Sequence, residues 1–314
     1  STELQEMLNV IGVKTIDELF AEIPNNLRLN KDLDIPCGMS ELEMTRELTS
    51  LSEINKTVDK NVCFLGGGAY DHIIPAAIDH LLLRGDFFTA YTPYQPEVSQ
   101  GTLQCIYEYQ SLICSLTGMD QTNASLYEGA TANVEAIKMA EAQTGRKKVI
   151  LLDTINPAYR KVIKTINGAQ DTEIITLSFE DGVCEVTKLA RAIDDKTAAV
   201  LVQYPNFFGC LEDIENIAKM AHEAGALFIV CANPIALAIL EAPGNLGADI
   251  VTGEGQPLGV PLSFGGPYIG FLAAKKALLR KMPGRIVGKT LDIDGKQGFV
   301  LTLQKLRKKH LQSR

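Results

Sequence analysis

The segment from Ala248 to Phe271, ADIVTGEGQPLGVPLSFGGPYIGF, has the pattern of a short apolar strand, a polar turn, a Gly-Gly-Pro turn and a second strand. The apolar runs favour buried strands, and the glycines and prolines favour tight connections between them. No lysine occurs anywhere from Met220 to Ala274. The polar turn carries Gln256, whose amide can hydrogen-bond but cannot form an imine. The segment therefore predicts two buried strands joined by a loop without a reactive amine.

Strand and helix patterns alternate from Ser125 onward. The expected strands cover residues 147–153, 173–179, 198–205, 226–232, 248–253 and 268–274, and the expected helices cover residues 157–166, 186–193, 210–225 and 275–282. Continuous apolar strands separated by amphipathic helices indicate a buried, mainly parallel sheet with helices on both faces. We therefore predict an α/β fold, with residues 61–290 forming one large α/β domain.

Residues 1–60 differ from the rest because helical spacing of apolar residues dominates them. Thr15 is a candidate N-cap with Glu18 as its capping-box partner, and a further helix is expected to start at Ser40. We predict a helical N-terminal arm or cap. An arm packed against a neighbouring subunit and a small cap on the chain's own domain are about equally expected.

The composition is that of a soluble globular protein, with 46% apolar and 22% charged residues among 314. The net charge of −8 argues against a nucleic-acid partner, because phosphate binding needs a basic face. No charge-free apolar stretch approaches the roughly 20 residues that cross a membrane, so no membrane association is expected. The only cationic run, residues 305–314, is expected to be a solvated helix end.

The cysteines and histidines show no spacing that indicates a metal site. Seven cysteines form an odd set without a Cys-x-x-Cys pair, and several lie in apolar runs. This pattern favours reduced, buried thiols in a cytoplasmic protein. No metal is therefore expected.

Two residues that pyridoxal-phosphate enzymes use to hold their cofactor, a lysine and an aspartate, are absent from the expected sheet region. The layout of residues 248–271 is that of the lysine loop of pyridoxal-phosphate enzymes, which hold their cofactor as a Schiff base on a lysine. Gln256 occupies the place where that lysine is expected. The ring nitrogen of the cofactor normally pairs with an aspartate at a strand end, but the strand in position for it ends in Cys231, Ala232 and Asn233. Two independent absences predict a degenerate site and hence a partner subunit.

A third segment, at Gly129, Ala130 and Thr131, precedes an amphipathic helix and could bind phosphate through free backbone N–H groups. Taken alone, a simple helix cap is the favoured interpretation. With the two absences above, we interpret it as a vestigial phosphate turn.

Two loops combine polar and aromatic residues on irregular backbone, a composition that often lines sites. Their candidate site-lining residues are Tyr70, Asp71, His72, Tyr94, Gln95 and Glu97. Pro93 and Pro96 could equally fix a simple turn, with the tyrosines as half-buried anchors. The two interpretations are weighted evenly.

These motifs also carry a resemblance to a known family. The segments FLGGGAYDH, YTPYQPEVSQGTLQ, YEGAT, EGQPLGVPLSFGGPYIGF and RKMPGRIVG, found in order between about Glu3 and Gln304, resemble the first subunit of the two-subunit glycine dehydrogenase (decarboxylating), the P-protein of the glycine cleavage system. The resemblance implies a pyridoxal-phosphate transferase fold of the aspartate-aminotransferase type. It also implies that a homologous subunit 2 carries the lysine and holds pyridoxal phosphate, in a heterotetramer.

The family reaction would decarboxylate glycine and pass the aminomethyl group to the lipoyl group of the H-protein. The resemblance places Gln256 at the lysine position and Cys231 at the aspartate position, and gives the residues of the two loops lining roles. Because family members continue into a smaller C-terminal α/β domain, residues 291–314 are expected to begin a truncated C-terminal region.

Two other readings stay open. One is a non-catalytic scaffolding paralogue that only binds a dimer partner. The other, less favoured, is a stand-alone pyridoxal-phosphate decarboxylase or aminotransferase that uses Lys275. That lysine follows a strand at a helix start, which suits a solvated cap better than a buried imine.

Overall fold

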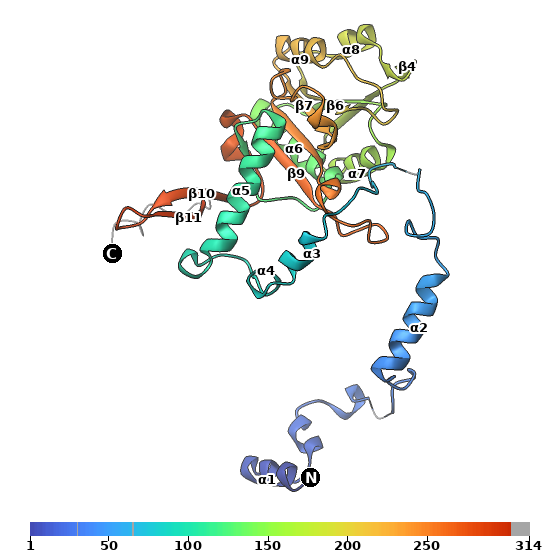
Figure 1. Cartoon of the computed structure of the whole chain (residues 1–314), viewed down its shortest axis with the longest axis vertical. Coiled ribbons are helices and arrows are strands. Elements are labelled where there is room, and N and C mark those ends of the chain that lie inside the picture. Colours follow the sequence, from blue (N-terminus) through green and yellow to red (C-terminus); the bar gives the residue numbers. More distant parts are fainter. Residues whose placement is uncertain (30, 65, 303–314) are drawn as a thin grey trace. The chain divides into compact units, whose positions relative to one another are not determined.

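The computed structural model describes residues 1–29, 31–64 and 66–302 (Figure 1). The chain divides into two compact units, Ser1–Asn61 and Val62–Arg314, which are described separately. The predicted basic helix end at residues 305–314 lies outside the described residues, as does residue 303 onward of the expected C-terminal region.

The first unit contains α1 (Thr2–Ile11), the 3-10 turns η1 (Ile16–Phe20) and η2 (Asn25–Leu27), and α2 (Glu41–Glu53). The predicted helix start at Ser40 is confirmed: its hydroxyl accepts from Glu43 N, and the Glu43 carboxylate accepts from Ser40 N at 2.9 Å. The predicted cap at Thr15 is wrong in detail. Its side chain caps no backbone N–H, and the short helix that follows is 3-10 rather than α.

The second unit is built on a seven-stranded sheet in the order β1-β9-β8-β7-β6-β2-β3. Its strands are β1 (Gln121–Thr122), β2 (Lys148–Leu152), β3 (Glu173–Leu177), β6 (Thr197–Tyr204), β7 (Leu227–Ala232), β8 (Ile250–Glu254) and β9 (Gly270–Ala274). Neighbours from β8 to β3 are parallel, whereas β9 is antiparallel to both β8 and β1. The predicted mainly parallel sheet is therefore confirmed.

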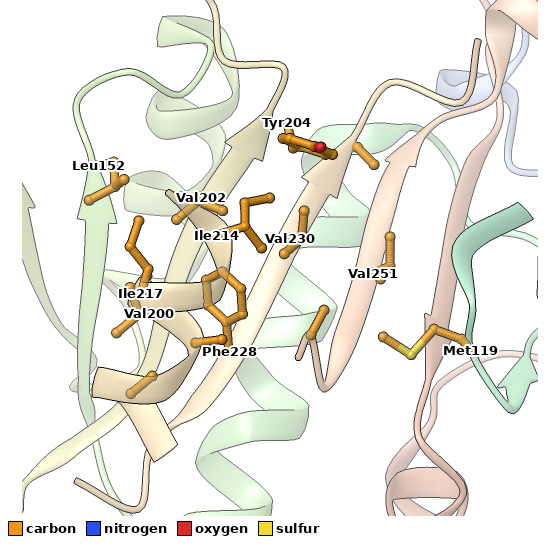
Figure 2. Packing of buried hydrophobic residues seen from close by; sticks show 14 of the residues in the cluster. Met119, Leu152, Val200, Val202, Tyr204, Ile214, Ile217, Phe228, Val230 and Val251 are labelled. Carbon is orange, nitrogen blue, oxygen red and sulfur yellow. The ribbon is translucent and has the colours of Figure 1, made fainter. Parts of the chain in front are cut away.

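Helices cover both faces of this sheet. They are α5 (Gln100–Thr117), α6 (Gly129–Thr144), α7 (Pro157–Asn167), α8 (Val186–Ala192) and α9 (Ile214–Glu223). Because side chains alternate along a strand, Val200 and Val202 join a core with α5, α8 and α9, whereas Leu201 joins one with α6 and α7. Figure 2 shows Phe228 in the first core. Its complete burial contributes roughly 1.5–3 kcal/mol.

Shorter elements complete the unit. They are α3 (Ala77–Leu82), α4 (Gly85–Phe88), η3 (Pro96–Val98), β4 (Phe179–Glu180), β5 (Val183–Cys184), η4 (Ala236–Ala238), η5 (Gln256–Leu258), η6 (Lys276–Lys281), β10 (Ile286–Leu291) and β11 (Gln297–Thr302). The helix expected at 275–282 is a 3-10 helix that ends at Lys281, two residues before Pro283. The antiparallel hairpin β10–β11 spans the expected domain end at residue 290.

Candidate functional site

The carboxyl ends of β6, β7 and β8 meet at one edge of the sheet, where ligands of open α/β folds usually bind. The register sets Gln203, Cys231 and Thr252 side by side. A cavity of about 20 Å³ lies at this edge. Its lining residues are Tyr70, Tyr159, Gln203, Cys231, Ala232, Asn233, Pro234 and Glu254. The sheet edge therefore brings together Tyr70 and Cys231, which sequence reasoning had selected from distant segments.

Gln256 begins η5, directly beyond the end of β8, and its residue is only 2% exposed. Its side-chain Oε1 accepts a hydrogen bond from Tyr70 N at 2.9 Å. Its Nε2 donates to Tyr70 O at 2.9 Å and to Val260 O at 2.8 Å. The amide of Gln256 thus forms hydrogen bonds with three backbone groups. An amide nitrogen, unlike the amine of a lysine, cannot form a Schiff base.

Cys231 is buried near the end of β7. Asn133 Nδ2 donates to its sulfur at 3.4 Å, and Asn133 Oδ1 accepts from Thr252 Oγ1 at 2.5 Å. Burial raises the pKa of the Cys231 thiol to about 11, with a smaller contribution from the charge of Glu254. The thiol is therefore neutral near pH 7 and cannot act as the carboxylate that a protonated ring nitrogen requires.

The vestigial phosphate turn is the first turn of α6, and carboxylates of the chain itself already cap it. Glu128 accepts from Ala130 N at 2.6 Å and from Thr131 N at 3.0 Å. Glu254 accepts from Gly129 N at 3.0 Å. The helix N-terminus, a favourable place for an anion, is thus satisfied internally. A phosphate would find no free N–H group on these three residues and would meet two acidic side chains.

The side chain of Glu254 is held in a largely buried position. Burial raises the pKa of this carboxyl, hydrogen bonds from Gly129, Gln256 and Ile269 lower it, and the neighbouring Glu128 raises it. Sequence reasoning missed both glutamates. The available signal was their position, one directly before the Gly-Ala-Thr turn and the other at the end of a predicted strand.

Aromatic side chains fill the remaining space. Burial is the main cause that raises the pKa of Tyr70 and raises that of Tyr159 well above its ordinary value. A Cβ atom added to Gly129 would lie 2.9 Å from the Tyr159 hydroxyl, so this turn and α7 are in close contact. A cavity of about 20 Å³ holds on the order of one water molecule. The residues of this edge offer pyridoxal phosphate no amine at position 256 and no carboxylate at position 231, and Glu128 and Glu254 take the N–H groups that would bind its phosphate.

The other predicted lining residues lie in two separate exposed groups. Asp71 and His72 follow Tyr70 at the surface. Tyr94 accepts a hydrogen bond from Arg285 at 3.4 Å, and its ring lies 5.7 Å from that guanidinium. Gln95 and Glu97 are exposed beside it. Among the described residues, no hydrogen bond joins the segment at 70–72 to the one at 94–97.

Lys275 lies at the opposite edge of the sheet. Because β9 is antiparallel to β8, Ala274 pairs with Ile250 at the start of β8, far along the strand from Glu254. The Lys275 amine is 3.1 Å from Asp249 Oδ1 and half-exposed. This position gives no support to a stand-alone enzyme that uses Lys275.

A model of the family "Glycine cleavage system P-protein" matches residues 1–314. The chain belongs to this family. It is 55% identical to a probable glycine dehydrogenase (decarboxylating) subunit 1 of Desulforamulus reducens, over 98% of this chain and 69% of that relative. A relative of the same name from Carboxydothermus hydrogenoformans is 51% identical, again over 98% and 69%.

A solved structure agrees with the sequence comparisons. The inhibitor-bound glycine decarboxylase (P-protein) of the glycine cleavage system matches with a TM-score of 0.89 and 44% identity, over 97% of this chain and 68% of that chain. The predicted family and the pyridoxal-phosphate transferase fold are therefore confirmed.

The cysteines correct one expectation. All seven are free, but Cys37, Cys63 and Cys105 are exposed, and only Cys184 and Cys231 are fully buried. The expectation of buried thiols is therefore wrong for these three cysteines and confirmed for Cys184 and Cys231. Within residues 1–29, 31–64 and 66–302, no helix is long and apolar enough to cross a membrane. The same residues contain no cluster of three or more potential metal ligands.

Proposed function

We propose that this P-protein family member is the non-lysine-bearing subunit of glycine dehydrogenase (decarboxylating). In this proposal a homologous lysine-bearing subunit 2 holds pyridoxal phosphate, and the complex decarboxylates glycine and passes the aminomethyl group to the lipoyl group of the H-protein. The chain would work in the cytoplasm. The names of the relatives support the reaction, and their designation as subunit 1 supports a partner chain.

The residues at the sheet edge support the assignment of the cofactor to the partner subunit. The sheet edge where this fold would hold the cofactor has Gln256 in place of an amine, a neutral thiol at Cys231 in place of a carboxylate, and Glu128 and Glu254 on the phosphate turn. The cavity there is about 20 Å³. These features support the proposal that the cofactor chemistry comes from another chain.

The contribution of this chain would be a wall of the partner's active site. Asp71 and His72 are exposed polar groups on a loop anchored at the sheet edge, and Tyr94, Gln95 and Glu97 form a second exposed group. Large apolar side chains are also exposed in the same unit: Phe64 is 93%, Ile73 96%, Tyr91 87% and Phe264 85% exposed. In the proposal these side chains are among those that the partner subunit covers. Covering them would exclude water from the reaction.

Reconstitution tests the proposal. The purified chain and a lysine-bearing subunit 2 are assayed separately and together for glycine-dependent release of carbon dioxide in the presence of lipoyl H-protein. Activity only in the mixture supports the proposal. A mixture that forms a complex but is no more active than subunit 2 alone would support a scaffolding paralogue instead.

A second measurement addresses the cofactor. The chain alone is incubated with pyridoxal phosphate, reduced with borohydride, and examined by mass spectrometry for a pyridoxyl group on each lysine. We expect only scattered, substoichiometric labelling of surface lysines. Stoichiometric labelling of one lysine, together with activity of the chain alone, would overturn the assignment of the cofactor to the partner.

A further inference from the structure

We propose that Gln256 is a positioning residue, which clamps the loop at residues 66–72 and thereby fixes Asp71 and His72 for the partner's active site. The inference rests on the proposed function and adds a specific task to it. Where a cofactor-holding chain would carry a lysine, this chain would carry an amide that organises its own backbone.

The clamp is a two-point contact with a single distant residue. Gln256 accepts from Tyr70 N and donates to Tyr70 O, each at 2.9 Å, across 186 positions of sequence. A primary amide presents a donor and an acceptor side by side. It can therefore form with one residue the pair of hydrogen bonds that a neighbouring β-strand would otherwise form. Gln256 is buried and Tyr70 is half-buried, so the loss of either hydrogen bond would leave a poorly hydrated polar group without a partner.

Gln256 is itself rigidly held. Its backbone N donates to Glu254 Oε1 at 3.1 Å, and its carbonyl accepts from Val260 N at 3.0 Å. Its Nε2 also donates to Val260 O at 2.8 Å. The clamp is therefore built on β8 and η5, and the loop takes its position from the sheet.

Few hydrogen bonds from distant side chains reach the rest of the loop. Gly66, Gly67 and Gly68 all have positive φ, at 56°, 76° and 109°, a backbone that only glycine adopts without strain. Asn156 Nδ2 donates to Gly67 O at 2.7 Å, the other long-range side-chain bond to the described part of the loop. Without the bonds to the Tyr70 backbone, the loop would keep the bond at Gly67 and the packing of the Tyr70 ring at the sheet edge.

The clamp acts directly on the turn that presents the exposed residues. Tyr70 O accepts from His72 N at 3.2 Å as well as from Gln256 Nε2. The direction of the Asp71 and His72 side chains therefore depends on a carbonyl that Gln256 fixes. A lysine at position 256 could donate to this carbonyl but would leave Tyr70 N without an acceptor, and a glutamate would have the opposite defect.

The test uses Gln256→Met, which keeps the length of the side chain and removes its hydrogen bonds. Gln110→Met is the matched control, because buried Gln110 clamps Val287 in the same way, with bonds of 2.9 and 3.1 Å, between α5 and β10. Each variant is combined with subunit 2 and H-protein. The measurements are kcat and KM for glycine, melting temperature, and hydrogen exchange of peptides from the 66–72 loop.

We expect both variants to lower the melting temperature by similar amounts. Only Gln256→Met should speed hydrogen exchange in the loop and lower kcat, by roughly tenfold to 100-fold, since small displacements of positioned groups have effects of this size. Gln110→Met should keep kcat within about twofold of the wild type, because it touches neither the loop nor the reacting groups. Equal loop exchange or equal kcat in the two variants would overturn the inference.

Two further variants keep the inference testable if Gln256→Met does not fold. Asp71→Asn and His72→Ala alter only exposed side chains, and at least one of them should lower kcat of the complex. If neither does, the loop has no task in the reaction and the inference fails. If the wild-type mixture itself is inactive, the proposed function fails, while the exchange measurement still decides whether Gln256 holds the loop.

Discussion

The carboxylate of Glu254 accepts hydrogen bonds from three backbone N–H groups that belong to different elements. They are Gly129 N of α6 at 3.0 Å, Gln256 N of η5 at 3.1 Å and Ile269 N, before β9, at 3.3 Å. At the scale of single residues, this side chain takes the position of an external anion and links a helix to two loops. Its loss would leave buried donors unsatisfied.

We predict that Glu254→Gln lowers the free energy of unfolding by about 1–3 kcal/mol near pH 7, because the amide nitrogen faces an N–H that needs an acceptor. The native pKa of Glu254 is raised above 4.5, so the folded state binds this proton more tightly than the unfolded state. The stability contribution of Glu254 therefore falls as pH rises from about 4.5 through the raised native pKa. Urea titrations from pH 4 to 8 should show the wild-type advantage shrinking across this window.

Exposed Glu215 provides the control, since Glu215→Gln should change stability little at any pH. A wild-type advantage that grows with pH between the wild type and Glu254→Gln would contradict the raised pKa.

A second residue-scale prediction concerns Gln256→Lys. The new amine should not hold pyridoxal phosphate, because Cys231 offers no carboxylate and Glu128 and Glu254 still cap the phosphate turn. After borohydride reduction, mass spectrometry should find no stoichiometric pyridoxyl group at position 256, and the variant alone should not decarboxylate glycine. A lysine-bearing subunit 2 treated in parallel is the positive control. Robust activity of the single variant would show that the cavity reorganises more freely than its packing suggests.

At the scale of elements, β8 is packed so tightly that it tolerates no side chain at Gly253. A Cβ atom there would lie 2.3 Å from Ala232 O and 2.3 Å from Phe271 Cζ. We predict that Gly253→Ala destabilises the fold by more than about 3 kcal/mol, since both neighbouring strands would have to move. Gly101 of α5 has open space and an ordinary φ, and Gly101→Ala should stabilise by up to about 1 kcal/mol. Thermal melting of both variants checks the pair, and equal melting temperatures would refute the packing argument.

The elements also explain what sequence reasoning could reach. Strands such as β6 are buried on both faces and therefore consist of continuous apolar runs, so the six expected strands were predicted correctly. The strands β1, β4, β5, β10 and β11 were not predicted. The 3-10 form of η6 was missed because helical spacing of apolar residues does not distinguish short helix types. The cap that Glu254 provides for α6 was missed for another reason. The bond from Gly129 N to Glu254 joins residues 125 positions apart, and no local pattern encodes such a pair.

The lining residues show the same limit. Tyr70 could be chosen by composition, and the structure brings it to Cys231 and Gln256. Whether Asp71, His72 and the segment at 94–97 line one site depends on a second chain, so a single sequence does not decide it. Their roles stay predictions.

At the scale of the whole molecule, the unit Ser1–Asn61 lacks a core of its own. Leu8 is the only buried residue among its described positions, whereas Leu48, Leu51 and Ile54 of the α2 region are 57%, 52% and 78% exposed. A segment of this size cannot be stable without burying apolar surface. The unit therefore has to bury this surface against another body, and both expected arrangements, an arm on a neighbouring subunit and a cap on the chain's own domain, would supply that burial.

We predict that limited proteolysis of the isolated chain cuts first within residues 1–61, and that addition of subunit 2 slows these cuts at least tenfold. Mass spectrometry of the fragments identifies the cut sites, and an unrelated protein at the same concentration is the control. Cuts that stay equally fast in the active complex would indicate that the helical segment is not covered by the partner.

The internal caps on α6 bear on whether the stability of the chain depends on a cofactor. A protein that closes over a coenzyme gains stability from it and loses that stability when the vitamin is scarce. Here the groups that cap the helix, Glu128 and Glu254, are side chains of the polypeptide and are present as soon as it is synthesised. If subunit 2 holds the cofactor, as proposed, this chain needs none in order to fold, and a shortage of vitamin B6 would destabilise only subunit 2.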